Sequence, residues 1–137
     1  MMTGAKERYE MRVTADASRV GDLRKAVVAF AEEVGFGDTA QIALAVSEAI
    51  TNAVVHAYRD SDQVGDVRVV ACNEPEKLVV VVRDYGDGMT PRADSPGLGL
   101  GLPLITTMTD ELQIEAADGA GTLLRMHFRK PAAAEAA

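Results

Sequence analysis

Apolar and polar positions alternate with two different periods along the first half of the chain. Residues 8–14 alternate one by one, as the residues of a half-buried strand do. From residue 20 to 34 the apolar positions recur every three or four residues, which predicts a helix. Asp38 then offers a cap for a second helix, which the pattern places over about 40–58.

The second half of the chain reads mainly as strands. Two β-rich runs, 66–72 and 77–83, flank a short polar segment and predict neighbouring antiparallel strands joined by a hairpin loop. We expect a third helix from near Gly99 to near Glu111, and a last hairpin formed by 112–117 and 122–129.

This order of elements favours an α+β fold. Hairpins without strict alternation of strand and helix predict a two-layer sandwich, in which the helices cover one face of a largely antiparallel sheet and leave the other face for a partner. The 137 residues are the length of one domain, which we place at 1–130. The remaining segment, 131–137, has nothing to pack and is expected to be disordered.

Composition and charge narrow the class of protein. With a formal net charge of −7 and no local Lys/Arg cluster, the chain is a poor direct partner for nucleic acid. No apolar run reaches the eighteen or so residues of a membrane helix, and the first residues do not form a secretory signal. The single cysteine, Cys72, forbids an internal disulfide, so we expect a cytoplasmic protein without a membrane partner.

A polar stripe runs along the predicted second helix. Glu48, Asn52 and His56 are spaced four residues apart, so they stack on one side of an otherwise apolar helix. A carboxylate and an amide that face a buried surface are costly unless they are paired or bind something. The stripe is therefore either the exposed side of an amphipathic helix or the lining of a site.

The second predicted hairpin strand ends in the sequence Asp84-Tyr-Gly86-Asp-Gly88. An aspartate at a strand end can accept a hydrogen bond from an exocyclic amine, and glycines let a flat ring approach the backbone. The alternative is a tight glycine turn that Asp84 caps locally. This motif alone does not decide between them.

A third motif, Gly97-Leu-Gly99-Leu-Gly101-Leu, leads into the last predicted helix. Free N–H groups and the helix dipole at such a point attract an anion, for which phosphate is the natural candidate. The run is neither a Walker A loop nor a dinucleotide fingerprint. A glycine-rich hinge before an amphipathic helix is the other interpretation.

Taken in order, these motifs resemble those of the GHKL ATPases. Residues 48–52 resemble the N box of that family, 84–88 its first glycine box and 97–102 its second, while Gly121-Thr122 is similar to the Gly-Thr before the last strand. The resemblance covers roughly 8–130, and four ordered motifs are far more specific than one. It is strongest with the bacterial anti-sigma factor serine/threonine kinases.

The resemblance implies a Bergerat ATP-binding fold with ATP and Mg²⁺ as cofactors. It implies that Asp84 reads the adenine amine, with Gly86, Gly88 and Thr122 beside the base. It further implies that Asn52 ligates Mg²⁺ and that Glu48 is the general base. The phosphates would lie under Gly97, Gly99, Gly101 and a short lid, 89–96, whose basic residue is Arg92.

The function implied is that of a protein kinase that sequesters a sigma factor and phosphorylates an anti-anti-sigma antagonist protein on serine or threonine. Such kinases are generally dimers, so a homodimer is expected. Two alternatives remain open at this point. One is a nucleotide-dependent binding module that transfers no phosphate, and the other is a weak ATPase that works as a conformational switch.

Overall fold

The computed structural model describes residues 7–56, 65–86, 96–117 and 121–131, with the side chains of His56 and 96–101 outside that description. Its elements follow one another in the order β1 (Arg8–Thr14), η1 (Ala17–Arg19), α1 (Val20–Glu33), α2 (Ala40–His56), β2 (Asp66–Asn73), β3 (Lys77–Asp84), α3 (Pro96–Met108), β4 (Glu111–Ala116) and β5 (Thr122–Arg129).

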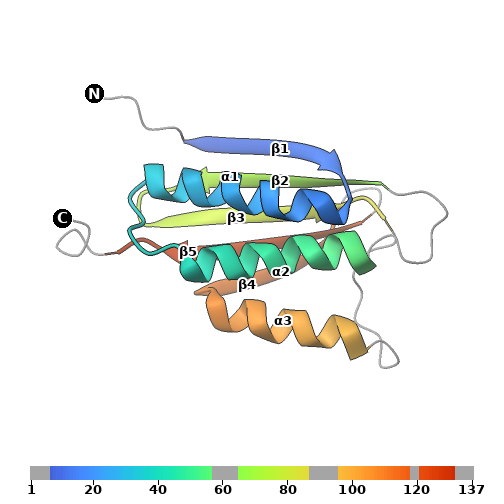
Figure 1. The fold of residues 1–137 in the computed structure, drawn as a ribbon. Coiled ribbons are helices and arrows are strands. Elements are labelled where there is room, and N and C mark those ends of the chain that lie inside the picture. Colours follow the sequence, from blue (N-terminus) through green and yellow to red (C-terminus); the bar gives the residue numbers. More distant parts are fainter. Residues whose placement is uncertain (1–6, 57–64, 87–95, 118–120, 132–137) are drawn as a thin grey trace.

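The strands form one five-stranded sheet in the order β1-β2-β3-β5-β4, and each neighbouring pair is antiparallel. Figure 1 shows α1, α2 and α3 side by side on one face of this sheet. The other face carries no helix of the described chain. The expected two-layer α+β architecture is thus confirmed.

The core lies between the sheet and the helices. Alternate residues of the three central strands point into it, namely Val67, Val69 and Ala71 of β2, Leu78, Val80 and Val82 of β3, and Leu124, Met126 and Phe128 of β5. Because side chains alternate between the two faces of a strand, Asp84 and Thr122 continue these rows on the helix-covered face. Two polar residues therefore stand at one end of an apolar layer.

Helix α2 is the central helix of the layer and lies between α1 and α3 (Figure 1). Asp38 stands just before it, and its Oδ1 accepts the N–H of Ala40, the first helical residue, at 3.0 Å, which satisfies one of the free N–H groups of the first turn. Its buried face carries Ala45, Ala49 and Ala53, four residues apart. These small side chains let the helix backbone approach the sheet closely.

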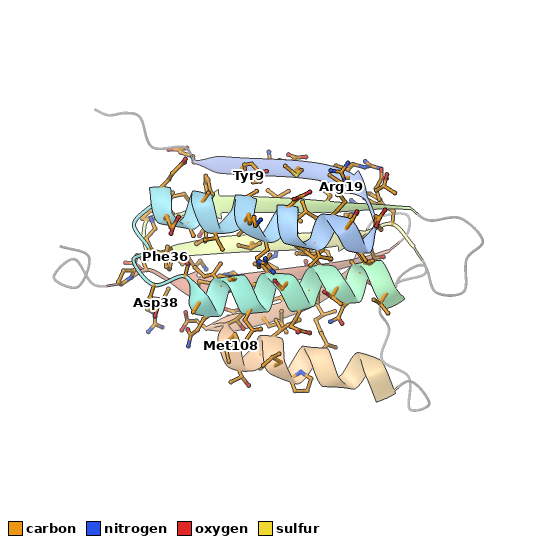
Figure 2. The ribbon with its side chains drawn as sticks, viewed as in Figure 1. Tyr9, Arg19, Phe36, Asp38 and Met108 are labelled. Carbon is orange, nitrogen blue, oxygen red and sulfur yellow. The ribbon has the colours of Figure 1, made fainter. Side chains whose placement is uncertain are left out.

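Two partly buried side chains border the core at its opposite sides. Tyr9 of β1 packs against it beside α1, with its ring centroid 6.2 Å from that of Phe30, and Met108 of α3 packs against it from the other side (Figure 2). The core therefore extends under all three helices.

The third helix differs from the sequence prediction by three residues at each end. It runs over Pro96–Met108 rather than 99–111. Proline suits the first turn of a helix, where its missing N–H is not needed, so the helix begins at Pro96, before the Gly99 start predicted from the glycine run. At the other end Asp110 already donates its N–H to the carbonyl of His127, at 2.9 Å, and Glu111 opens β4 instead of closing the helix.

The chain enters and leaves the fold beside the hairpin between β2 and β3. The carbonyl of Glu7 accepts the N–H of Asn73 at 2.8 Å, and the N–H of Lys130 donates to the carbonyl of Glu76 at 2.9 Å. Pro131, the last described residue, is half-buried. The rest of the expected tail, 132–137, lies outside the described residues, as does the predicted end of α2 beyond His56.

Among the described helices, none combines the length and the apolar character that crossing a membrane requires.

Candidate functional site

Four elements meet at one end of the molecule, opposite the β2–β3 hairpin. The end of β3, the start of β5, the last turns of α2 and the start of α3 all lie there (Figure 1). Asp84 and Thr122 belong to the two strands, and Glu48 and Asn52 to α2. The fold thus brings parts of all four sequence motifs to the same end.

Asp84 is the most deeply buried charged residue of the site, with an exposed fraction of 0%. Its Oδ1 accepts the N–H of Gly86 at 3.1 Å and the N–H of Thr122 at 3.3 Å. Its Oδ2 is buried and has no hydrogen-bond partner within the described chain. One oxygen is therefore used to hold the fold together, and the other is an acceptor that still needs a donor.

Burial raises the pKa of Asp84 above its ordinary value of 3.8, and the two backbone hydrogen bonds and the charge of Arg83 oppose this rise. The rise means that taking the carboxylate out of water costs more than those contacts return. A donor placed at Oδ2 would stabilise the ionised form. The carboxylate is thus more favourable with a bound amine than without one.

Gly121 holds the start of β5 against Asp84. Its φ is +98°, and a Cβ built there would fall into the carbonyl of Asp84 and 2.9 Å from the Cα of Tyr85. Only glycine fits such a close approach. The Gly-Thr motif was visible in the sequence, but this contact was not, because it depends on how β3 and β5 pair.

Glu48 and Asn52, the two residues of the polar stripe whose side chains are described, do not lie on an exposed side of α2. Asn52 is 4% exposed, and its Nδ2 is buried with no hydrogen-bond partner among the described residues. Glu48 is half-buried one turn earlier, about 6 Å along the helix axis. The structure therefore favours the interpretation in which this stripe lines a site, since an unused buried amide is costly.

The third motif lies within the first half of α3. The N–H group of Gly97 belongs to the first turn, which has no earlier helical carbonyl to bind, whereas those of Gly99 and Gly101 lie at the start of the helical ladder and within it. Gly88 and most of the expected lid, 89–95, lie outside the described residues. The backbone thus places Gly97 where an anion is favoured.

A hollow of about 620 Å³ lies at the other end of the molecule, where Phe36, Asp38 and Ile42 line it beside the α1–α2 turn. It contains none of the predicted site residues. The chemistry of the motifs, rather than the depth of this hollow, therefore locates the candidate site.

The fold and these residues define a class of protein. Residues 13–128 match the family described as the histidine kinase-like ATPase domain, and the chain belongs to that family. The match confirms the family expected from the order of the sequence motifs.

Particular relatives carry more specific names. The anti-sigma F factor of Caldanaerobacter subterraneus subsp. tengcongensis is 31% identical over 130 residues, which is 85% of this chain and 90% of that protein. The anti-sigma F factor of a Thermoanaerobacter species is 33% identical over the same shares. The serine-protein kinase RsbW of Bacillus cereus is 30% identical over 141 residues, 90% of this chain and 87% of that protein.

Proposed function

We propose that this chain is an anti-sigma factor serine/threonine kinase. It binds Mg-ATP, sequesters a sigma factor and phosphorylates an anti-anti-sigma antagonist protein. The names of the relatives support both halves of this proposal, since one group is named for its action on a sigma factor and the other for its serine kinase activity. Both groups align with most of this chain, so the likeness covers the whole ATPase domain.

The observation that carries the nucleotide site is the buried Oδ2 of Asp84. The exocyclic amine of adenine has an N–H that supplies the donor this oxygen lacks, and Gly86 and Thr122 fix the carboxylate so that it keeps one orientation. A guanine would present a carbonyl at the equivalent position, which a carboxylate repels. The site therefore selects adenine.

The amide of Asn52 fits a metal-bound nucleotide. Turned with its oxygen toward the ligand, it offers the type of donor atom that Mg²⁺ prefers, together with the phosphate oxygens. The metal supplies charge neutralisation during phosphoryl transfer. Glu48, one turn away, accepts the proton of the acceptor's serine or threonine hydroxyl. The hydroxyl oxygen then bonds to the γ-phosphorus, and the bond from that phosphorus to the leaving oxygen of ADP breaks.

The glycines complete the nucleotide site in this proposal. Gly86 and Gly88 lie beside the base, and Gly97, Gly99 and Gly101 approach the phosphates through their backbone. The acidic chain binds the anionic nucleotide because N–H groups and the metal supply the local positive field.

The protein acts in the cytoplasm as a homodimer. The group that receives the phosphate is a hydroxyl of a protein and not water.

Substitution of Glu48 by Gln distinguishes a protein kinase from a binding module that transfers no phosphate. Transfer of labelled γ-phosphate to a panel of purified anti-anti-sigma proteins is expected to fall roughly a hundredfold or more, while the Kd for Mg-ATP, measured by calorimetry, changes little. The matched control is Glu33→Gln, because Glu33 is exposed at the end of α1. Unchanged transfer in Glu48→Gln would remove this residue from the role of base.

The wild-type protein distinguishes the other two functions. Nucleotide binding without transfer to any acceptor, and without phosphate release, would identify a binding module. Phosphate release without a protein acceptor would identify a switch-type ATPase. Failure to bind Mg-ATP at all would contradict the nucleotide site itself.

A further inference from the structure

Tyr85 separates two residues of the candidate site, Asp84 and Gly86, but its ring belongs to a different cluster. The guanidinium carbon of Arg12 lies 4.2 Å from the ring centroid and that of Arg83 lies 4.4 Å from it. Arg68 of β2 lies between these two arginines in the strand registers and interacts with the same tyrosine. Three arginines from three strands therefore surround one half-buried ring.

These arginines form one row across the helix-free face of the sheet. Arg12 is paired with Arg68, and Arg68 with Arg83, in the registers of β1 with β2 and of β2 with β3. Like charges directly opposite one another destabilise a sheet. A row of this kind persists only where other groups compensate for the repulsion.

The compensation comes from two carboxylates and from the ring itself. The Nε of Arg12 donates to Asp66 at 2.9 Å, and the Nε of Arg68 donates to Glu10 at 2.7 Å. The face of Tyr85 attracts the cations of Arg12 and Arg83 through its quadrupole. Each arginine is thus oriented, and together they hold the ring in one place.

The backbone of Tyr85 is fixed from the opposite direction. A Cβ at Gly121 would come within 2.9 Å of the Tyr85 Cα, so the residue that leads into β5 packs directly on Tyr85. The preceding residue, Asp84, accepts two backbone N–H groups at its Oδ1, and one of them is the N–H of Gly86, the residue that follows Tyr85. Movement of the Tyr85 ring would therefore shift the residues on both sides.

We propose that Tyr85 is a positioning residue for nucleotide binding, because its ring, held by Arg12 and Arg83 on the helix-free face, fixes the backbone from Asp84 to Gly86 in the conformation that receives adenine. The inference rests on the proposed nucleotide site and adds a residue that does not contact the nucleotide. Its physical basis is preorganisation: if the receiving conformation is populated only in part, the apparent affinity falls by that fraction.

The test measures the Kd of Mg-ATP by calorimetry for the full chain and four variants. Tyr85→Leu removes the ring and is expected to raise the Kd about tenfold, since both cation contacts are lost. Tyr85→Phe keeps the ring and is expected to stay within about twofold of wild type. Arg12→Met and Arg83→Met should each raise the Kd by about threefold.

A double variant and a control distinguish positioning from general loss of stability. Arg12→Met should add little to Tyr85→Leu, because both changes break the same contact. The control is Arg125→Met, an arginine on the same face that is paired with Glu115 at 3.2 Å and not with the tyrosine. It should leave the Kd unchanged. Thermal melts without nucleotide record the stability of each variant separately.

Wild-type binding together with an unchanged Kd in Tyr85→Leu would overturn this proposal and leave the nucleotide site intact. Equal weakening by Tyr85→Phe and Tyr85→Leu would also overturn it, since the ring would then not matter. Absence of Mg-ATP binding in the wild type would overturn both the proposed function and this inference. A Kd about tenfold higher in Tyr85→Leu, together with a Kd near that of wild type in Tyr85→Phe, would support it.

Discussion

Asp84 shows how one side chain serves both the fold and the candidate site. Its Oδ1 joins the end of β3 to the start of β5, and its Oδ2 is buried without a described partner. The raised pKa that burial causes records the energetic cost of this arrangement in the ligand-free protein. Stability is given up at this residue, and in the proposed function a bound nucleotide would restore it.

A pH series on Asp84→Asn measures that cost. The folded state binds the carboxyl proton more tightly than the unfolded chain does, so the stability that protonation provides is lost as the pH rises from below 3.8 through the higher folded-state pKa. Wild type should therefore lose stability relative to Asp84→Asn over this range, as measured by urea unfolding without nucleotide. Affinity for Mg-ATP should fall in the variant at neutral pH.

The control for this series is Asp22→Asn, since Asp22 is an exposed carboxylate on α1 with a side-chain exposure of 64%. The stability of Asp22→Asn should follow that of wild type across the same pH range. If Asp84→Asn also ran parallel to wild type, the carboxylate would be no more costly in the fold than in the unfolded chain.

At the scale of residues, the polar side chains of the candidate site could be picked out from the sequence, whereas their surroundings could not. A strand that ends in Asp84 and a stripe through Asn52 are local patterns, so they could be read directly. The contact of Gly121 with Asp84, and the arginines around Tyr85, depend on strand registers between distant segments. No local pattern contains that information.

Helix α3 is the element whose sequence least favours its structure. Its first half contains three glycines, and Pro103 deprives the carbonyl of Gly99 of its helical donor. Thr106 and Thr107 bond their hydroxyls to the carbonyls of Leu102 and Pro103, both at 2.9 Å, which ties the second half to the helix backbone. Ile105, fully buried, then anchors that half in the core.

Replacing Gly101 by Ala tests the reason for this weak helix start. Alanine is favoured over glycine by about 1 kcal/mol in a helix, so the ligand-free Tm should rise by about 4 °C. Mg-ATP affinity should fall if the phosphates approach this backbone, because the added Cβ would obstruct them. Thermal melts and calorimetry measure the two effects.

Thr107→Ala is the matched control, since Thr107 is exposed on the same helix and away from its glycines. It should change affinity little. A lower Tm for Gly101→Ala would instead show that glycine is needed there for packing.

The error in the limits of α3 has the same origin. A glycine at every second position reads as a hinge or as the start of a helix, so the sequence placed the first residue near Gly99. The structure extends the helix back to Pro96, a suitable first-turn residue. Strands with alternating apolar positions, such as β1 and β5, were predicted within a residue because burial on one face specifies them strongly.

At the scale of the whole molecule, the helix-free face of the sheet stands apart from the rest of the chain. It carries a row of arginines, although the formal net charge of the chain is −7.

The pairing of β2 with β3 and of β4 with β5 was predictable from the short loops that join them. The pairing of β3 with β5 was not, since α3 and β4 intervene in the sequence. The architecture could be inferred from the order of elements, but the strand order could not.

The proposed homodimer is tested on the intact protein. Light scattering at tens of micromolar should give twice the chain mass of 14.5 kDa. No described helix covers the helix-free face of the sheet, so this face is available for a second copy. If its row of arginines lies in the dimer interface, raised salt should shift the dissociation constant of the dimer. A monomer at that concentration would contradict the dimer.

The place where the chain enters and leaves the fold has a practical consequence. Glu7 and Lys130 are both bonded beside the β2–β3 hairpin. Asp84 is the last residue of β3, and this strand ends at the opposite end of the sheet (Figure 1). A chain anchored to a sensor surface through either end therefore turns the proposed adenine-binding end toward the solution. Fluorescent labels or tandem fusions attached at these ends should likewise leave nucleotide exchange unhindered.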